Sequence, residues 1–284
     1  MRTKSGIEKK LRVLVIGAHP DDCETLAGGL SILYRRNDHD VKFVCATSGN
    51  ATHPVLGGGQ YARIRAEEMR IGCETADIEH EIFDIASNTL MPNIAIREAY
   101  IKLIRTYNPD LILTHRLNDY HPDHRYISVI IQDAIYYVTV PNICPLTPHL
   151  TRRPVIAYMY DDIQRPSFTP DIIIDIDGAI EMKVLMCHAH TSSMYEWTPW
   201  IEGHTDELPE AEAERLEWLR KSETLRVSKI AGKYRDRLID KYGSDRGNRI
   251  VCAEAFEICP CAHGGMLNDD GTLNEDVISL YFPF

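Results

Sequence analysis

Two clusters of histidine and aspartate account for most of the chemistry that this sequence could perform. The first reads Gly17-Ala-His-Pro-Asp-Asp-Cys-Glu24 and directly follows an apolar run, Leu11 to Ile16. The second, His121-Pro-Asp-His124, lies about a hundred residues further along the chain. Imidazole and carboxylate groups bind divalent metal ions, and a carboxylate beside such an ion can take a proton from water. The two clusters therefore predict one metal site built from two distant loops.

Within the first cluster, two residues have the spacing of metal ligands. His19 and Asp22 are three residues apart on the turn that follows the apolar run, so both could reach one ion. A catalytic zinc ion typically has three protein ligands and keeps one position for water. Asp21 lies between the two ligands and could face that open side. We therefore expect His19 and Asp22 to bind the metal and Asp21 to act as the general base.

The second cluster offers two more imidazoles at the same spacing. If His121 and His124 lie in the first turn of a helix, both rings are on one face. One ring can complete the metal shell, while the other can donate to an oxyanion or protonate a leaving amine. Asp123 is then expected to hydrogen-bond a histidine and fix its tautomer.

Strand and helix patterns alternate through the first half of the chain. Strands are expected at 11–17, 41–47, 81–85 and 111–114, and helices at 25–36, 60–73 and 92–107. This order predicts an α/β, Rossmann-like fold with a mostly parallel sheet flanked by helices. Ligands of such sheets bind beyond the carboxyl ends of the strands. The residues that follow the four expected strands are His19, Ser48, Ser87 and His115. The active site is therefore expected at this rim.

The second half of the chain has a less regular pattern. Helices are expected at 126–137, 179–190 and 210–241, and strands at 154–160 and 171–176. We find no convincing linker, which favours a single domain over 1–284 with an irregular C-terminal extension from about residue 191. The loop at 48–59, rich in Gly, Asn and Pro, is expected to be a mobile flap over the site.

Composition excludes several classes of function. The 284 residues carry a formal net charge of -11, which argues against nucleic-acid binding because phosphate contacts need clustered Lys and Arg. No apolar stretch reaches the roughly 18–20 residues that span a bilayer. No signal-peptide core precedes the first strand, and the eight cysteines are scattered, so a cytoplasmic protein with buried thiols is expected. The close pair Cys259-Pro-Cys261 is interpreted as incidental.

The combination of motifs resembles a known family. Residues 18–24, followed by Gly28-Gly29 and, downstream, by His121-Pro-Asp-His124, are similar to the PIG-L/LmbE-like zinc-dependent N-deacetylases. The resemblance extends over roughly residues 11–190. It implies roles for six residues of the two clusters. The zinc ligands are His19, Asp22 and His124; Asp21 is the general base; His121 stabilises the oxyanion or serves as the acid, and Asp123 supports it.

Other family features are altered in this chain. The family usually has Thr-x-Gly-Glu after the second strand, whereas this chain reads Thr47-Ser-Gly-Asn50. After the third strand, Ala86-Ser-Asn88 replaces a Pro-Asp-Gly whose aspartate contacts the sugar. Arg65 resembles a substrate-contacting arginine. Substrate contacts are therefore expected from Arg65, Ser48 and Asn50. These departures indicate changed substrate contacts around a hydrolytic set that is complete.

The function expected from the sequence is a metal-dependent hydrolase that removes an N-acetyl group from an amino sugar, such as an N-acetylglucosamine derivative, or from a glycoconjugate. Zn²⁺ is the expected cofactor, although Fe²⁺ and Co²⁺ also suit such ligands. Trp197 and Trp200 could form a sugar-stacking wall or could pack in a core. The partner is a small molecule, and a homo-oligomer is compatible with the sequence.

Three alternatives remain open at the level of sequence. The chain could hydrolyse another amide or an ester, or it could be a non-catalytic relative that binds metal or sugar. It could also bind a nucleotide, although Gly-x-Gly-x-x-Gly is absent after the first strand and two acids stand where a pyrophosphate would need N–H groups.

Overall fold

One seven-stranded sheet forms the centre of the protein. The computed structural model describes residues 10–161, 163 and 166–284. The strand order is β3-β2-β1-β4-β5-β7-β6. Five strands are parallel, which confirms the predicted mostly parallel sheet: β1 (Arg12–Gly17), β2 (Asp40–Cys45), β3 (Glu79–Ile82), β4 (Leu111–Thr114) and β5 (Val155–Met159). Two strands complete one edge, namely β6 (Ile172–Asp175) and β7 (Ala253–Ile258), and β7 runs antiparallel to both β5 and β6.

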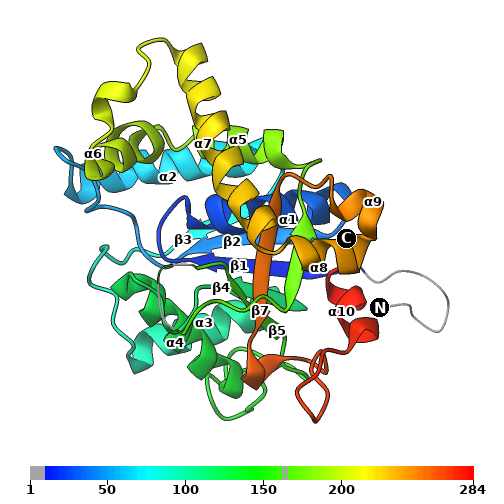
Figure 1. The fold of residues 1–284 in the computed structure, drawn as a ribbon. Helices are drawn as coiled ribbons and strands as arrows, with labels where there is room; N and C mark the ends of the chain where they lie inside the picture. Colours follow the sequence, from blue (N-terminus) through cyan, green and yellow to red (C-terminus); the bar gives the residue numbers. More distant parts are fainter. Residues whose placement is uncertain (1–9, 162, 164–165) are drawn as a thin grey trace.

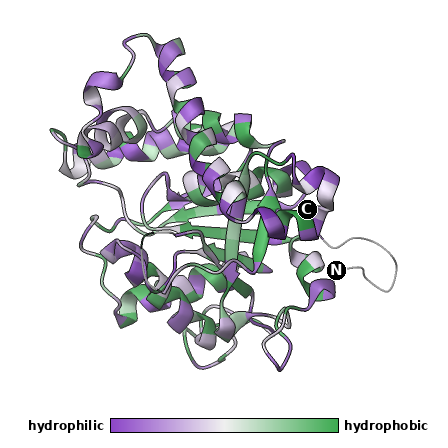
Figure 2. Cartoon of the chain, viewed as in Figure 1, coloured by the Kyte–Doolittle hydropathy of each residue, from purple (hydrophilic) through white to green (hydrophobic). Residues whose placement is uncertain are grey.

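Helices cover both faces of this sheet (Figure 1). On one face lie α1 (Asp22–Arg36), α2 (Gly58–Thr75), α5 (Ile180–His188) and α7 (Glu212–Lys233). On the other face lie α3 (Ile94–Tyr107) and α4 (Pro122–Tyr137). Successive strand residues point to opposite faces, so Val13 and Val15 join the core under α1 whereas Leu14 and Ile16 join the core under α3 and α4. Figure 2 shows the resulting hydrophobic sheet between more polar outer surfaces.

The glycine pair in α1 marks a close contact between the first helix and the last strand of the sheet. Glu254 of β7 accepts hydrogen bonds from the backbone N–H groups of Gly29 and Leu30, each at 2.8 Å. A Cβ atom on Gly29 would lie 2.8 Å from two side-chain carbons of Ile176 and 3.0 Å from Glu254 Oε1. Glycine at this position therefore permits the approach of β7 and its carboxylate to the helix.

The largest differences from the predicted elements lie in the second half of the chain. The segment from 191 onward was expected to be irregular, but its strand β7 lies inside the sheet between β5 and β6. The helix predicted over 210–241 is two helices, α7 and α8 (Arg235–Tyr242), separated by Tyr234 with φ −116° and ψ 32°. Strand pairing partners lie far apart along the chain here, so local pattern does not reveal them. The shorter elements are a π-helix (Ser192–Trp197), α6 (Thr198–Glu202), α9 (Ser244–Gly247), α10 (Glu275–Tyr281) and 3₁₀ turns at Thr205–Glu207 and Pro260–Ala262.

The predicted helices near the site begin earlier than expected. The first starts at Asp22 and not at residue 25, and α4 starts at Pro122 and not at residue 126. Both metal-binding motifs therefore lie at helix N-termini that follow the carboxyl ends of β1 and β4. Among the described residues, no helix has both the length and the hydropathy needed to cross a membrane.

Candidate metal centre and catalytic site

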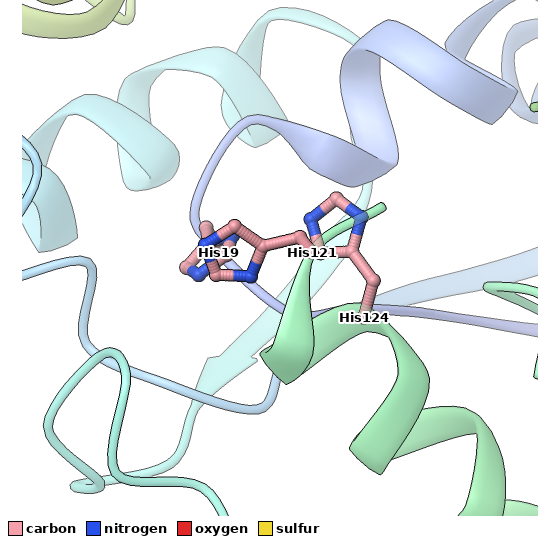
Figure 3. Close-up of side chains that lie close together, drawn as sticks. All are labelled: His19, His121 and His124. Atoms are coloured by element: carbon pink, nitrogen blue, oxygen red, sulfur yellow. The ribbon is translucent and has the colours of Figure 1, made fainter. Parts of the chain in front are cut away.

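The two sequence clusters meet at one rim of the sheet. His19 lies on the loop after β1. His121 and His124 lie at the start of α4, the helix that follows β4 in the chain (Figure 3). Because β1 and β4 are adjacent parallel strands, their carboxyl ends share one edge. The ring centroids of His19 and His121 are 4.7 Å apart, and those of His19 and His124 are 5.3 Å apart. The structure thus brings together residues that are a hundred positions apart in sequence.

Hydrogen bonds determine which ring nitrogens are free to bind a metal. The Nε2 atom of His19 lies 3.1 Å from Asp123 Oδ2, so in the neutral ring Nε2 carries the proton and Nδ1 keeps the lone pair that a metal ion would bind. For His124, Nδ1 lies 3.0 Å from Asp119 Oδ1, which leaves the lone pair on Nε2. Asp22 Oδ2 is 3.5 Å from His19 Nδ1 and 3.5 Å from His124 Nε2. Two lone pairs and a carboxylate therefore converge, as a divalent ion with three protein ligands requires.

His121 has the opposite arrangement. Its ring caps α4, and Nδ1 accepts the backbone N–H of Asp123 at 3.1 Å. The neutral ring must then carry its proton on Nε2, which makes Nε2 a hydrogen-bond donor. Burial and the nearby charge of His19 lower the pKa of His121, so the neutral form prevails near pH 7. Its ligand atoms lie within 4.8 Å of those of His19 and His124, but binding through Nε2 would require loss of this proton. The geometry therefore fits an oxyanion donor better than a ligand.

Two residues of the site were not predicted from the sequence. His115, directly after β4, was expected at the rim but was assigned no role; it stacks on His124 at 3.8 Å, and its Nε2 lies 3.2 Å from Asp22 Oδ2. Asp119 holds Nδ1 of His124 and is 5 % exposed. A carboxylate that fixes a metal-binding histidine is a common feature of metal sites. The position of His115 after a strand could have signalled its role, whereas no spacing rule singles out Asp119.

The electrostatics of the cluster favour added positive charge. Although burial disfavours the imidazolium, the carboxylates of Asp123 and Asp22 raise the pKa of His19 to about 9. Burial likewise opposes protonation of His115, but Asp22 and Asp119 raise its pKa to about 9. Burial and the charge of His115 lower the pKa of His124 to about 4. The concentrated carboxylates thus draw cations to the cluster, and a divalent ion satisfies the same demand.

Asp21 has an unusual backbone conformation and a polar environment. Its φ angle is 120°, a region that L-residues rarely occupy and that is often found at functional sites. One carboxylate oxygen, Oδ2, lies 2.9 Å from a guanidinium nitrogen of Arg65 and accepts a hydrogen bond from Ser193 Oγ. Burial and the neighbouring Asp22 raise the pKa of Asp21, against the opposing effect of Arg65. A carboxylate with a raised pKa is suited to accept and return a proton.

The residues expected to contact substrate have other roles in the structure. Arg65 is only 2 % exposed, because its guanidinium is paired with Asp21 and with Glu68 at 2.9 Å. Asn50 Oδ1 accepts the backbone N–H of Ser87 at 3.0 Å and so ties together the loops after β2 and β3. Ser48 is buried beside them. These internal contacts could not be predicted from hydropathy or motif position, and Arg65 also lines the cavity beside Asp21, so substrate contact by the three residues stays a prediction.

Asp123 also differs from the expectation. The resemblance implied that its carboxylate supports His121, but Asp123 Oδ2 contacts His19 and accepts the backbone N–H of Asn88 at 2.7 Å. These bonds outweigh burial and lower the pKa of Asp123. Asp123 therefore orients His19 through its carboxylate, whereas it meets His121 through its backbone N–H.

A cavity of about 510 Å³ opens over the metal-binding cluster. The residues that line it include His19, Asp21, His121 and His124 from the cluster, together with Trp197 and Ile201. The rings of Trp197 and Trp200 stack with centroids 5.5 Å apart, and Trp200 is half exposed. Aromatic faces at a cavity mouth offer a surface for a sugar ring or another flat apolar group.

Comparison with known families agrees with this geometry. Residues 14–135 match the model of the PIG-L family, described as GlcNAc-PI de-N-acetylase. This segment is similar to the PIG-L family, and the match covers less than half of the chain. The matched segment includes both histidine–aspartate motifs and the elements that carry them.

Relatives of similar sequence include two kinds of enzyme. A diacetylchitobiose deacetylase of Thermococcus kodakarensis is 25 % identical over 207 residues, which are 67 % of this chain and 74 % of the relative. A 4-oxalmesaconate hydratase of Pseudomonas putida is 24 % identical over 197 residues, which are 65 % of this chain and 75 % of that enzyme.

Solved structures of the same two kinds of enzyme share the fold of this chain. The N,N'-diacetylchitobiose deacetylase of Pyrococcus horikoshii has a TM-score of 0.67 at 21 % identity, covering 91 % of this chain and 87 % of its own. The 4-carboxy-2-hydroxymuconate hydratase of Pseudomonas putida has a TM-score of 0.69 at 18 % identity, covering 87 % and 96 %.

Proposed function

We propose that this protein is a metal-dependent N-deacetylase that acts on an N-acetylated amino sugar or glycoconjugate. One observation carries the proposal: the free lone pairs of His19 and His124 converge with Asp22, while Asp21 and the Nε2–H donor of His121 flank them. Hydrolysis of an amide needs these three functions together, namely a metal site, a base and an oxyanion donor.

The residues divide the reaction between them. A bound divalent ion would supply a water of lowered pKa and would polarise the acyl carbonyl. Asp21 takes a proton from water while the water oxygen attacks the carbonyl carbon. The Nε2–H group of His121 donates to the carbonyl oxygen as negative charge develops there. Asp21 then returns the proton to the amine as the C–N bond breaks, which yields acetate and the free amino group.

The ion in this proposal is Zn²⁺, with His19, Asp22 and His124 as its ligands. Two imidazoles and one carboxylate form a common catalytic zinc site, although Fe²⁺ and Co²⁺ also suit such ligands. Metal analysis of the purified protein tests the assignment. His19→Ala is expected to lose most of the bound metal, and full metal content in that variant would refute His19 as a ligand.

The charges of the cavity support a neutral sugar substrate. Among the described residues that line the 510 Å³ cavity, the two arginines are already neutralised. Arg65 pairs with Asp21 and Glu68, and Arg226 pairs with Glu223 at 2.7 Å. Trp197 offers a flat apolar wall beside them. A substrate with hydroxyl groups and an apolar face fits this lining better than a dicarboxylate does.

The deciding experiment is an assay of acetate release by the metal-loaded protein over a panel of N-acetylated amino sugars and disaccharides, with p-nitrophenyl esters as a second panel. We expect release of acetate with an equal amount of free amine from at least one sugar. Turnover of esters alone, or no turnover with full metal content, would refute N-deacetylation of sugars.

Hydration of an unsaturated acid is a second candidate function. One relative and one solved structure of similar fold are named as hydratases. An activated water molecule and a carboxylate base can also add water to a C=C bond. The adjoining cavity of about 320 Å³ contains Lys229, an exposed cation that could bind a substrate carboxylate. Loss of absorbance from an unsaturated dicarboxylate, abolished by Lys229→Ala and without acetate release from any sugar, would favour this candidate.

A further inference from the structure

Asp21 is held by side chains from two separate segments of the chain. We propose that Ser193 is a positioning residue for Asp21, and that the π-helix Ser192–Trp197 thereby completes the catalytic site. This inference rests on the proposed function, because it takes Asp21 to be the base. The π-helix lies outside residues 14–135, which match the family model.

Both contacts to Asp21 involve the same oxygen. Ser193 Oγ donates a hydrogen bond to Asp21 Oδ2, and a guanidinium nitrogen of Arg65 lies 2.9 Å from that atom. Two donors on Oδ2 fix the plane of the carboxylate and leave Oδ1 to take the proton. Ser193 is 5 % exposed and lines the 510 Å³ cavity, so its hydroxyl lies at the site itself.

The backbone of Asp21 explains why such a restraint is needed. A φ of 120° in a non-glycine residue costs on the order of 1–3 kcal/mol and persists only where surrounding contacts hold it. Asp21 lies just before α1, where the chain leaves β1 and turns into the helix. Without restraint, the side chain could leave the position from which it reaches water beside the ligands. The bonds from α2 and the π-helix oppose that movement.

Glu68 on α2 connects both restraints. Its Oε2 lies 2.9 Å from Arg65 and accepts a hydrogen bond from Ser192 Oγ at 2.8 Å. Its Oε1 accepts the backbone N–H of Ser192 at 2.7 Å. Glu68 therefore fixes the arginine and the first turn of the π-helix relative to each other, and Ser193 follows directly. π-Helical turns are rare and occur often at functional sites.

The kinetic test compares Ser193→Ala with Ser193→Thr, which restores a hydroxyl. We expect Ser193→Ala to lower kcat by about 10- to 100-fold, because small misplacements of a reacting group are costly. KM and metal content should stay close to those of the wild type, because the substitution removes a single oxygen atom from the cavity lining and changes no proposed ligand. Ser193→Thr should recover most of kcat. Ser228→Ala is the matched control and should leave kcat unchanged. It removes a hydroxyl that donates to the backbone carbonyl of Leu225 within α7.

A crystal structure of Ser193→Ala supplies a readout that does not depend on activity. We expect the Asp21 carboxylate to turn away from its wild-type position while the fold and the histidines stay in place. An unmoved carboxylate together with wild-type kcat would overturn the proposal, as would a lower melting temperature without a change in kcat. If the wild type releases no acetate, the proposed function fails, and the crystal structure still decides whether Ser193 positions Asp21.

Discussion

At the scale of single residues, three imidazoles of the site each have a partner that fixes one of their two ring nitrogens. Asp123 holds His19, Asp119 holds His124, and the backbone N–H of Asp123 holds His121. Each bond decides which nitrogen of the ring faces the cluster. The same three imidazoles with different partners would give a different set of ligands and donors.

Asp21→Asn tests the role of the base. The amide keeps the size of the carboxylate and can still meet Ser193 and the metal-bearing side of the cavity, but it cannot accept the proton from water. We expect kcat to fall by between about 10²- and 10⁴-fold with metal content unchanged. The measurements are acetate release and metal analysis on the same preparation. Turnover near that of the wild type would show that another group is the base.

Asp119→Asn tests the orientation of His124. Loss of the charged acceptor leaves Nδ1 of His124 without its carboxylate partner, so the tautomer that presents Nε2 is less favoured. We expect metal affinity to fall by about 10- to 100-fold, measured by competition with a chelator. The control is Asp133→Asn, a substitution at an exposed position of α4, the helix that carries His124, for which affinity should not change. Equal affinities in the two variants would contradict the assignment.

At the scale of elements, glycine positions separate close packing from open surface. Gly29 in α1 faces Ile176 and Glu254, whereas a Cβ atom on Gly232 in α7 meets nothing within 4 Å. Both are helical, so the same change to alanine has opposite consequences at the two positions.

We expect Gly29→Ala to destabilise the protein by about 1–3 kcal/mol, because the added methyl overpacks the contact with Ile176. Gly232→Ala should stabilise it by about 0.5–1 kcal/mol, because alanine loses less conformational entropy in a helix. Urea unfolding of the two variants and the wild type measures both effects. The same sign in both variants would contradict the close packing of β7 against α1.

The π-helix and α2 form the other functional pair of elements. Together they supply Ser193, Arg65 and Glu68 to the first turn of α1. Trp197, which lines the cavity, ends the same π-helix, so one short segment contacts Asp21 and also forms part of the cavity surface.

At the scale of the whole molecule, Glu254 links the last strand of the sheet to the first helix. It lies on β7, accepts two backbone N–H groups of α1 and pairs with Lys183 of α5 at 2.5 Å. Glu254 is 2 % exposed and Lys183 is 0 % exposed. The last strand is therefore tied to the helix that begins at the metal-binding motif.

Glu254→Ala is expected to lower the free energy of unfolding by about 3–5 kcal/mol, since it leaves the Lys183 ammonium buried without its partner. Chemical denaturation measures the loss. Glu79→Ala, which removes an exposed partner of Lys42, should change stability little and serves as the control. A small effect of Glu254→Ala would mean that the C-terminal strand contributes little to the fold.

The sequence by itself determined the features that depend on local order. Apolar runs followed by polar turns predicted the parallel sheet and the rim at which His19, Asp22 and His124 meet. The motifs also predicted the chemistry, because residue type and spacing limit what an imidazole or a carboxylate can do. Their resemblance to PIG-L deacetylases agrees with the match of residues 14–135.

Only the tertiary structure decided how distant segments meet. It paired Arg65 with Asp21 and Glu68, and it placed Asp123 on His19. It also brought Ser193 to Asp21 and placed β7 inside the sheet. These contacts join residues that are up to 172 positions apart, and no periodicity or spacing rule operates over such separations. They depend on packing, which the folded chain alone establishes.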